Sequence, residues 1–423
     1  MIEFKKGETI TLTNGTIAKI INELGRGGQG IVYLVDVGGQ HMALKWYMTP
    51  MPKKFYNNLE DNILKGAPSD AFLWPEYLTT KQNGSFGYIM KIRPQGYHEF
   101  GHYLLARAKL KSFDAMVNAA MKICEGFKAL HLSGLSYQDL NDGNFFIHPE
   151  TGDVLICDND NIFPDGENSG ILGKARYMAP EVVTGQSMPN KYTDRFSLSV
   201  ILFLLFYSNH PLEGSRVLAC PCMTEKFEKQ FYGKEPIFIY DKDNCTNRPV
   251  RGVHNNVLRR WMLLPEILRE TFTYEFSKEC LDNPSSRKLE RQWQSVIQKV
   301  RDILVVCPEC GEETFVNDDD NPKCMCCGRT IAISGILKIN ERNIFLTPKT
   351  KVYIDLDNTP DILVVSVPGD TFPIQLRNTT KDSWAVETPS GKLKSVAPNS
   401  TMPLKTGLKI NLNATIKGEL IKE

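Results

Sequence analysis

The chain has 423 residues, of which 42% are hydrophobic and 23% charged, and this is typical of a soluble globular protein with two or three domains. The formal net charge of +1 excludes a global field that would favour nucleic acid or an anionic membrane. The N-terminus lacks the apolar stretch of a signal peptide, and the longest apolar run, 198–207, is too short to span a bilayer. We therefore expect a cytoplasmic protein with no membrane contact.

Residues 8 to 95 are predicted to form strands and one helix. Val- and Ile-rich runs between glycine-bearing turns predict strands at 17–24, 31–37, 42–47 and 88–90. Phe55, Leu59 and Ile63 are spaced four residues apart, which predicts a helix over 54–65.

From about residue 100 to 304 the pattern is that of helices. Apolar residues recur at helical spacing over 114–130 and 292–305, and 197–207 is apolar nearly all round, as expected for a helix inside a folded lobe. From residue 333 onward, short β-rich runs alternate with Asn, Pro and Gly turns, which predicts a small sandwich or barrel. These runs are 343–346, 351–356, 362–367, 372–376, 384–387 and 408–412.

A glycine-rich pattern lies between the first two predicted strands. Gly25, Gly27 and Gly30 form G-x-G-x-x-G, and without Cβ atoms they allow backbone N–H groups to approach a phosphate closely. A plain glycine-rich hairpin is the alternative. A Rossmann site is less favoured, because a strand rather than a helix follows Gly30.

Two acidic motifs occur in the predicted helical region. Asp139 precedes Asn144 by five residues, and Asp158 ends an apolar strand that begins at Val154. An oxygen-only pair of this kind suits a hard divalent cation. Either aspartate alone would usually be a helix cap or a turn residue.

Five motifs, taken in order, resemble the signature of a eukaryotic-type protein kinase. They are the glycine-rich pattern, Ala43-Leu44-Lys45, the Asp139 loop with Asn144, Asp158-Asn159-Asp160, and Ala179-Pro180-Glu181. The resemblance covers roughly residues 16 to 304 and implies a multidomain α+β protein with a bilobal kinase fold. Its N-lobe would be 1–95 and its C-lobe 96–304.

The resemblance implies an ATP site and a catalytic base. Asp139 would accept the proton of a substrate hydroxyl, and Asn144 and Asp158 would hold Mg²⁺. Lys45 would neutralise the α- and β-phosphates, and Val32 would cover the base. The residues implied in ATP binding are Gly25, Gly27, Gly28, Gly30, Val32, Ala43, Lys45, and the backbone of Lys91 and Ile92.

Such a lysine normally requires a carboxylate from the following helix. Glu60, on the predicted helix, is our candidate, with an ordinary solvated glutamate as the alternative. Glu76 is weaker, because Trp74-Pro75 before it breaks a helix. Further along, Glu181 with Arg287 resembles the ion pair that braces a kinase C-lobe. Asp194 resembles the acid that steadies the catalytic loop.

Three departures from the kinase pattern affect activity and regulation. Tyr137-Gln138 replaces the usual His-Arg, which removes the partner of a phosphate on the activation segment. Asp160 stands where glycine is usual, and Lys174 stands where a Ser/Thr kinase often has threonine. Lys174 leaves the class of substrate residue open and would suit an acidic substrate.

Four of the eleven cysteines form two Cys-x-x-Cys pairs, separated by a short spacer. Four thiolates so close together predict a closed structural Zn²⁺ site, a zinc ribbon over 305–332. Its ligands would be Cys307, Cys310, Cys324 and Cys327. Cys326 would be a bystander or a substitute ligand, and a redox dithiol is the remote alternative.

The region 299–329 carries four basic and seven acidic residues, a net charge of −3 that disfavours nucleic acid. The β-rich tail, 333–423, faintly resembles forkhead-associated-like sandwiches and is expected to bind protein partners. The whole arrangement resembles bacterial eukaryotic-like kinases, some of which belong to tellurite-resistance-type stress systems. That resemblance implies a von Willebrand A protein and a metal-dependent phosphatase as partners.

The sequence therefore predicts ATP-dependent phosphoryl transfer to a protein Ser/Thr hydroxyl, with ATP, Mg²⁺ and structural Zn²⁺ as cofactors. A nucleotide-binding pseudokinase scaffold is the first alternative, although such proteins usually lose the lysine or one of the two aspartates. A small-molecule phosphotransferase is the second, and Ala179-Pro180-Glu181 with Arg287 favours a protein substrate over it.

Overall fold

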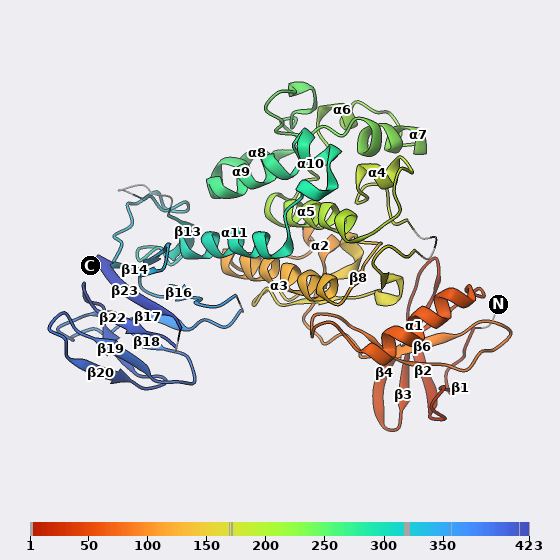
Figure 1. Cartoon of the computed structure of the whole chain (residues 1–423), viewed down its shortest axis with the longest axis horizontal. Helices are drawn as coiled ribbons and strands as arrows, with labels where there is room; N and C mark the ends of the chain where they lie inside the picture. Colours follow the sequence, from red (N-terminus) through yellow and green to blue (C-terminus); the bar gives the residue numbers. More distant parts are fainter. Residues whose placement is uncertain are drawn as a thin grey trace.

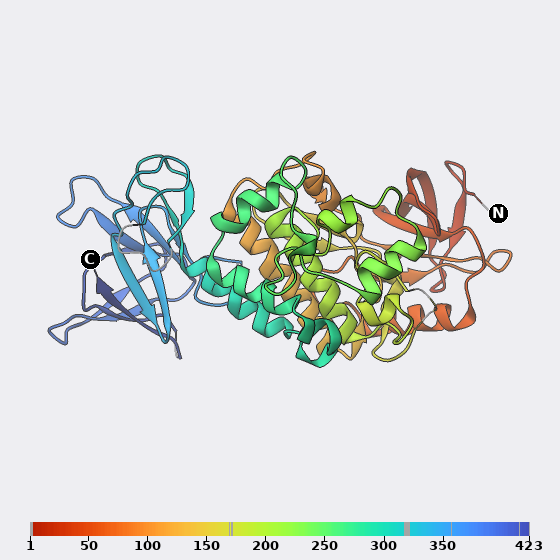
Figure 2. The same cartoon turned by 90° about the horizontal axis from the view of Figure 1, so that it is seen from above.

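The computed structural model describes residues 3–168, 170, 172–316, 322–356, 358–413 and 415–422. It places a β-rich part at one end, a helical part in the middle, and a small cysteine-bearing part beside a β-sandwich at the other end (Figures 1 and 2). Among these residues, no helix has both the length and the apolar character that crossing a bilayer requires. Asp318, Asp319 and Asp320, which the charge count includes, lie outside the described residues.

The N-terminal part is one antiparallel sheet of order β1-β2-β3-β4-β6-β5. Its strands are β1 (Thr9–Thr11), β2 (Ile17–Arg26), β3 (Gly30–Val37), β4 (Gln40–Tyr47), β5 (Pro75–Leu78) and β6 (Gly87–Met90). Helix α1 (Lys53–Lys65) packs Phe55 and Leu59 against aromatic residues of this sheet. The register places Lys45 opposite Val32 on one side and Tyr88 on the other, in the middle of the sheet.

The helical part is built around α5, a helix whose buried residues run without a break from Thr193 to Tyr207. The helices are α2 (Phe100–Leu104), α3 (Phe113–Leu132), α4 (Pro180–Val183), α5 (Lys191–Tyr207), α6 (Ser215–Leu218), α7 (Glu225–Glu228), α8 (Asn255–Leu263), α9 (Glu266–Glu275), α10 (Lys278–Asp282) and α11 (Glu290–Asp302). Short strands carry the loops of the site: β7 (His98–Glu99), β8 (Leu135–Ser136), β9 (Phe145–Ile147), β10 (Val154–Ile156) and β11 (Phe163–Pro164).

The predicted end of the last helix is wrong. Helix α11 stops at Asp302, and the next apolar residues form β12 (Leu304–Val306), which pairs with β13 (Glu313–Phe315). Burial as a strand satisfies Leu304 and Val305 as well as a helical turn would, so the apolar pattern alone could not distinguish the two.

The C-terminal part is a sandwich of two sheets around one core, as the tail pattern predicted. One sheet has the order β15-β14-β23-β22-β19-β20 and the other β16-β17-β18-β21. The strands are β14 (Gly335–Ile339), β15 (Arg342–Leu346), β16 (Lys351–Val352), β17 (Ile362–Ser366), β18 (Ile374–Asn378), β19 (Trp384–Glu387), β20 (Leu393–Val396), β21 (Thr401–Pro403), β22 (Lys409–Asn411) and β23 (Lys417–Lys422).

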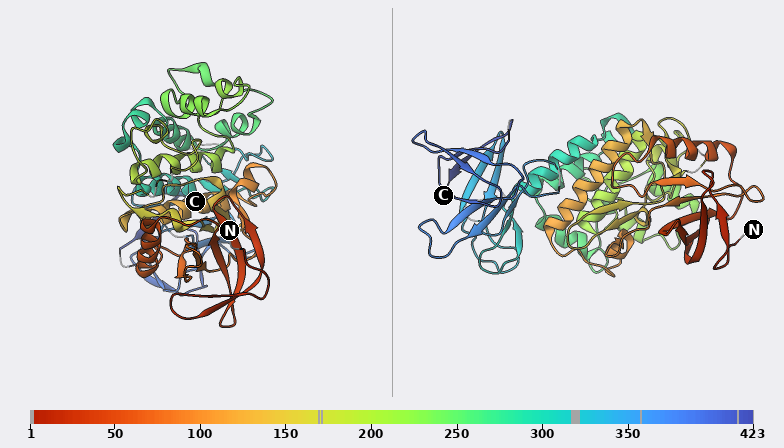
Figure 3. Two further views of the ribbon diagram at one scale, coloured as in Figure 1. Left: turned by 90° about the vertical axis from the view of Figure 1, so that its right-hand side faces the viewer. Right: turned by 90° about the horizontal axis from the view of Figure 1, so that it is seen from below.

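The sandwich lies at the end of the helical part that is opposite the N-terminal sheet (Figure 3). Asp114, at the start of α3, accepts hydrogen bonds from Lys351 Nζ at 2.7 Å and Tyr353 Oη at 2.8 Å. Asp302, at the end of α11, accepts two bonds of 2.8 Å from Arg342. The start of α3 and the end of α11, two helices that run antiparallel, therefore hold the sandwich by charged contacts.

Candidate active site

The glycine-rich loop joins β2 to β3. A Cβ added at Gly25, Gly27 or Gly28 would meet no protein atom within 4 Å, whereas one at Gly30 would collide with the backbone carbonyl oxygen of Trp46. Packing within the protein thus explains only Gly30. The other three leave open room beside the loop, which fits a backbone cradle for phosphate.

Lys45 is the buried cation of the site. It lies on β4 with 7% of its surface exposed, and its Nζ donates to Asp158 and to Asp160, the latter at 2.7 Å. Burial alone would lower the pKa of Lys45, but the charges of Asp160 and Asp158 raise it above its ordinary value. Lys45 is therefore positively charged and available to a phosphate oxygen.

The catalytic-loop motif follows β8. Asn144 Nδ2 donates to the backbone oxygen of Asp139 at 2.8 Å, and Asn141 Nδ2 donates to the same oxygen at 3.1 Å. The backbone N–H of Cys157 donates to the oxygen of Asn144 at 2.8 Å, which places this loop beside the one that carries Asp158. The structure therefore brings Asp139, Asn144, Asp158 and Lys45 to one place.

Asp139 and Asp158 influence one another electrostatically. Burial, with a contribution from the charge of Asp158, raises the pKa of Asp139 to about 6, while Lys174 opposes the rise. Lys174 Nζ donates to Asn141 Oδ1 at 2.9 Å. A carboxylate with a raised pKa, next to a second carboxylate and close to a lysine, has the properties of a proton acceptor beside a cation site.

A buried charged cluster on α3, α5 and α11 binds the backbone of the catalytic loop. Asp194, on α5, accepts hydrogen bonds from the backbone N–H groups of Tyr137 at 2.6 Å and Gln138 at 3.2 Å. Asp194 also contacts His131 of α3 at 3.1 Å, and His131 contacts Glu290 of α11 at 2.9 Å. The role predicted for Asp194 thus corresponds to contacts that the structure contains.

The two departures at Tyr137 and Gln138 have structural partners. Tyr137 is fully buried and its hydroxyl donates to the backbone oxygen of Cys157. Gln138 Nε2 donates to the oxygen of Glu167 at 2.5 Å, and its Oε1 accepts from Asn168 at 2.9 Å. Hydrogen bonds of the neutral Gln138 side chain therefore connect Glu167 and Asn168, in the activation segment, to the catalytic loop.

Glu60 does not take the place that the sequence assigned to it. It is exposed on α1 and forms no ion pair with Lys45 among the described residues. The carboxylates that pair with Lys45 are those of Asp158 and Asp160. The inner face of α1 carries Asn58, Leu59 and Asn62 instead. Glu76 forms an ion pair with the exposed Lys91, at 3.9 Å. Sequence reasoning missed Asp160, although its departure from glycine was the available signal.

The remaining predicted nucleotide residues surround Lys45. Ala43 is buried on β4 and Val32 is partly buried on β3, directly opposite Lys45 in the register. Lys91 and Ile92 follow β6 where the sheet leads into the helical part, and the side chain of Lys91 is 73% exposed. The assignment of the Lys91 and Ile92 backbone to adenine binding stays a prediction.

The brace predicted in the C-lobe is present. Arg287 donates to both carboxylate oxygens of Glu181, at 2.7 and 2.9 Å, and is 3% exposed. Such a bidentate pair fixes the end of the activation segment against the helical part.

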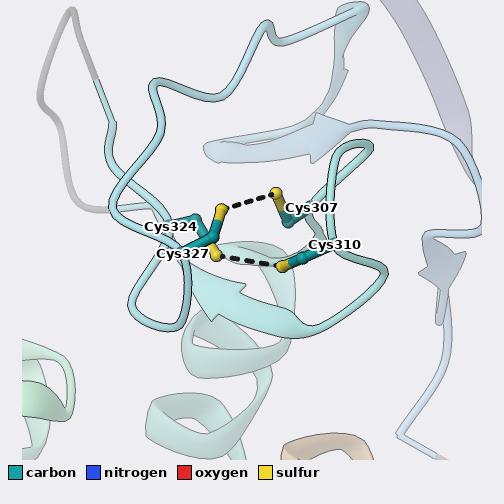
Figure 4. Close-up of side chains that lie close together, drawn as sticks. All are labelled: Cys307, Cys310, Cys324 and Cys327. Atoms are coloured by element: carbon teal, nitrogen blue, oxygen red, sulfur yellow. Dashed lines mark hydrogen bonds between the residues drawn. The ribbon is translucent and has the colours of Figure 1, made fainter.

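The four predicted cysteines form one cluster (Figure 4). Their sulfur atoms all lie within 4.8 Å of one another, with 3.9 Å between Cys307 and Cys327 and 3.6 Å between Cys310 and Cys324. Tetrahedral Zn–S bonds of about 2.3 Å imply sulfur separations of about 3.8 Å, so the donor set fits zinc. Cys326 is exposed and does not belong to the cluster.

Comparison with known proteins agrees with this geometry. The model of the protein kinase domain matches residues 18–235, more than half of the chain, and the chain therefore belongs to the protein kinase family. It is 27% identical to mouse protein kinase C delta type over 48% of this chain and 31% of that protein. It is 29% identical to the dual serine/threonine and tyrosine protein kinase of Bos taurus over 72% of this chain and 30% of that protein.

A third relative, ribosomal protein S6 kinase alpha-4 of Homo sapiens, is 25% identical over 49% of this chain and 28% of that protein. The chain thus aligns with less than a third of the length of each of these relatives. The shared part is the kinase domain, with a β-sheet N-lobe and a helical C-lobe.

Proposed function

We propose that this protein is an ATP-dependent protein kinase that phosphorylates Ser or Thr hydroxyls of a protein substrate. The observation that carries the proposal is the convergence of Lys45, Asp139, Asn144 and Asp158 beside a glycine loop with open room. When bound, ATP with Mg²⁺ would supply the phosphoryl group and neutralise the charge that develops during its transfer.

The chain's own residues would divide the work. Backbone N–H groups of the loop from Gly25 to Gly30, together with the ammonium of Lys45, would hold phosphate oxygens. Asn144 and Asp158 would hold Mg²⁺ with oxygen atoms, as a hard cation prefers. Asp139 would accept the substrate proton at a carboxylate oxygen.

Lys174 would stand beside the acceptor. Its ammonium donates to Asn141, and its charge acts on Asp139. A cation there would favour a substrate segment with acidic residues, which is the reading we propose. The dual-specificity name of one relative applies to that protein, and a Ser/Thr preference here is our own proposal.

The test is transfer of labelled phosphate from ATP with Mg²⁺ to acidic Ser/Thr peptides and to candidate partner proteins. We expect wild-type transfer and loss of at least about a thousandfold in Asp139→Ala and Asp158→Ala. The exposed Asp61, on α1, provides the control Asp61→Ala, which should retain wild-type rates.

The two alternatives predict other outcomes. A pseudokinase scaffold would bind nucleotide and partners without transfer, and Asp158→Ala would leave partner binding intact. A small-molecule phosphotransferase would label a metabolite and no protein. Failure of the wild-type protein to label any protein substrate would contradict the proposal.

We further propose that the cysteine cluster holds one structural Zn²⁺ and that the sandwich selects the protein partner. The domain limits 305–332 and 333–423, the bacterial stress-system setting, and the von Willebrand A and phosphatase partners belong to this proposal. Co-purification of such proteins with the full chain, but not with a chain that ends at residue 332, would support it.

A further inference from the structure

Both carboxylate partners of Lys45 lie on one short segment of chain, the 3-10 turn η2 (Asn159–Asn161) and its preceding residue. Asp160 is completely buried, and its Oδ2 accepts from Lys45 Nζ at 2.7 Å and also from the hydroxyl of Tyr47. Asp158 also accepts from Lys45, but 38% of its side chain is exposed. One partner is therefore fixed inside the protein, and the other faces the open part of the site.

Helix α1 supplies no charge to Lys45 in the described structure. Its buried polar residues are Asn58 and Asn62, whose amides both donate to the backbone oxygen of Ile162, at 2.7 and 2.9 Å. Ile162 follows Asp160 by two residues. The helix thus holds the segment that carries Asp160 and leaves the ion pair to that segment.

A buried carboxylate requires a charged or hydrogen-bonded partner to offset its lost hydration. Asp160 obtains two donors on one oxygen, while its Oδ1 has no hydrogen-bond partner among the described residues. The charge of Asp160 is therefore offset by the ammonium of Lys45 and the hydroxyl of Tyr47 rather than by solvent.

We propose that Asp160 is the positioning residue that holds Lys45 for phosphate binding, in the place assigned by the kinase pattern to a helical glutamate. This inference rests on the proposed ATP-dependent function. Because Asp160 retains Lys45, Asp158 is free to serve as a metal ligand without leaving the lysine unpaired. The ion pair then depends on the conformation of 158–162 rather than on the position of α1.

The first test compares Asp160→Asn with the matched variant Glu60→Gln, since each replaces one carboxylate by an amide of similar shape. We expect Asp160→Asn to raise both the KM for ATP and the dissociation constant of ATP, measured by calorimetry, by about tenfold or more. Glu60→Gln should leave both constants within about twofold of the wild type. Unaltered constants in Asp160→Asn, or an equal rise in Glu60→Gln, would overturn the inference.

Measuring the dissociation constant of ATP as well as the KM distinguishes a role of Asp160 in positioning Lys45 from a role in stabilising the fold. A purely structural loss would reduce the fraction of folded protein and hence kcat, while the ATP affinity of the remaining folded molecules would be unchanged. If Asp160→Asn does not fold, Tyr47→Phe replaces it, because that variant removes the other donor to Asp160 Oδ2. A rise of about threefold in the ATP dissociation constant would then support the inference, and a wild-type value would count against it.

Failure of the proposed function remains distinguishable. A wild-type protein that binds ATP but transfers no phosphate would contradict the kinase proposal, and the binding comparison between the two variants would still decide the role of Asp160. Unchanged transfer and binding in Asp160→Asn, with an active wild type, would reject only the role of Asp160.

Discussion

Single glycines of the phosphate loop differ in what they do. Gly30 is required by the fold, because a Cβ there would collide with the β4 backbone at Trp46, whereas a Cβ added at Gly27 would meet no protein atom within 4 Å. One sequence motif thus contains a glycine that packing within the protein requires, and glycines whose missing side chain leaves room for a ligand.

Gly30→Ala and Gly27→Ala should therefore fail in different ways. We expect Gly30→Ala to lower the free energy of unfolding by about 1–3 kcal/mol, as overpacking does. Gly27→Ala should unfold at the wild-type denaturant concentration but raise the KM for ATP. Chemical denaturation and ATP titration check the pair, and a destabilised Gly27→Ala would contradict the assignment.

Gln138 determines how the activation segment is held. Its amide already bonds Glu167 and Asn168, and no arginine stands there to bind a phosphate. We expect protein freed of phosphate by a phosphatase to retain wild-type kcat, provided the phosphatase is removed before assay. Activity that appears only after prior phosphorylation would refute this expectation.

At the scale of elements, α3, α5 and α11 meet in the cluster of His131, Asp194 and Glu290, to which Arg195 adds a bond of 2.8 Å from its Nε to Glu290. Burial alone would lower the pKa of His131, but its bonds to Asp194 and Glu290 raise it to about 9. Burial would raise the pKa of Glu290, but the bond from His131 and the contact with Arg195 lower it to about 2.

These shifts define a pH window for stability. The contribution of His131 is complete below its unfolded pKa of about 6.5 and is lost as pH rises through about 9. The contribution of Glu290 is present above its unfolded value of 4.5 and is lost as pH falls toward about 2. The cluster therefore contributes most to stability between about pH 4.5 and 6.5.

We therefore expect His131→Gln to remove most of the alkaline loss of stability between pH 6.5 and 9, a loss on the order of 3 kcal/mol at most. Urea unfolding followed by tryptophan fluorescence at several pH values measures it. His102, which is half-buried on α2, offers the control His102→Gln, which should keep the wild-type alkaline slope.

The sequence predicted best those helices and strands that bury an apolar face, because burial produces a regular pattern of apolar residues. The strands 17–24, 31–37 and 42–47 and the helix 54–65 lie within observed elements, because one face of each is apolar. Strand β20 was missed because three of its four residues are exposed, which removes the alternating pattern. Helix α5 begins before the predicted residue 197, because Asn190 caps it with bonds to Tyr192 and Thr193 and its first turns are polar.

Part of the site was also predicted, but from motif spacing rather than from apolar patterns. Lys45, Asp139, Asn144 and Asp158 were found from the spacing of motifs, and the structure brings them together. The pairing of Lys45 with Asp160 could not be predicted, because it depends on which face of α1 turns inward. Glu60 and Asn62 lie on the same helix, yet Glu60 is exposed and Asn62 is buried.

At the scale of the whole molecule, the cysteine cluster lies between the kinase domain and the sandwich. Cys307 directly follows β12, where the backbone oxygen of Val306 accepts a bond of 2.7 Å from Thr347 of the sandwich. A metal at the cluster would therefore fix the chain at this junction.

Cys310→Ser should reduce the zinc released per chain to near zero, while Cys326→Ser should leave about one equivalent. A colorimetric chelator after mild denaturation measures the metal. Equal zinc in the two variants would contradict the four-cysteine assignment. Retained zinc in Cys310→Ser with loss in Cys326→Ser would show that Cys326 is a ligand.

Helix α3 connects the sandwich to the catalytic loop. Asp114, near its start, accepts a hydrogen bond from the sandwich, and His131, near its end, contacts Asp194, which binds the backbone of the catalytic loop. Its 20 residues give a stiff rod of about 30 Å. Under the proposal that the sandwich selects the protein partner, a polypeptide bound there would need about nine extended residues to span this length and bring its hydroxyl to the catalytic loop. Under the same proposal, a substrate with a shorter connecting segment would bind the sandwich without placing its hydroxyl at Asp139, so the length of this helix would limit which substrates are modified.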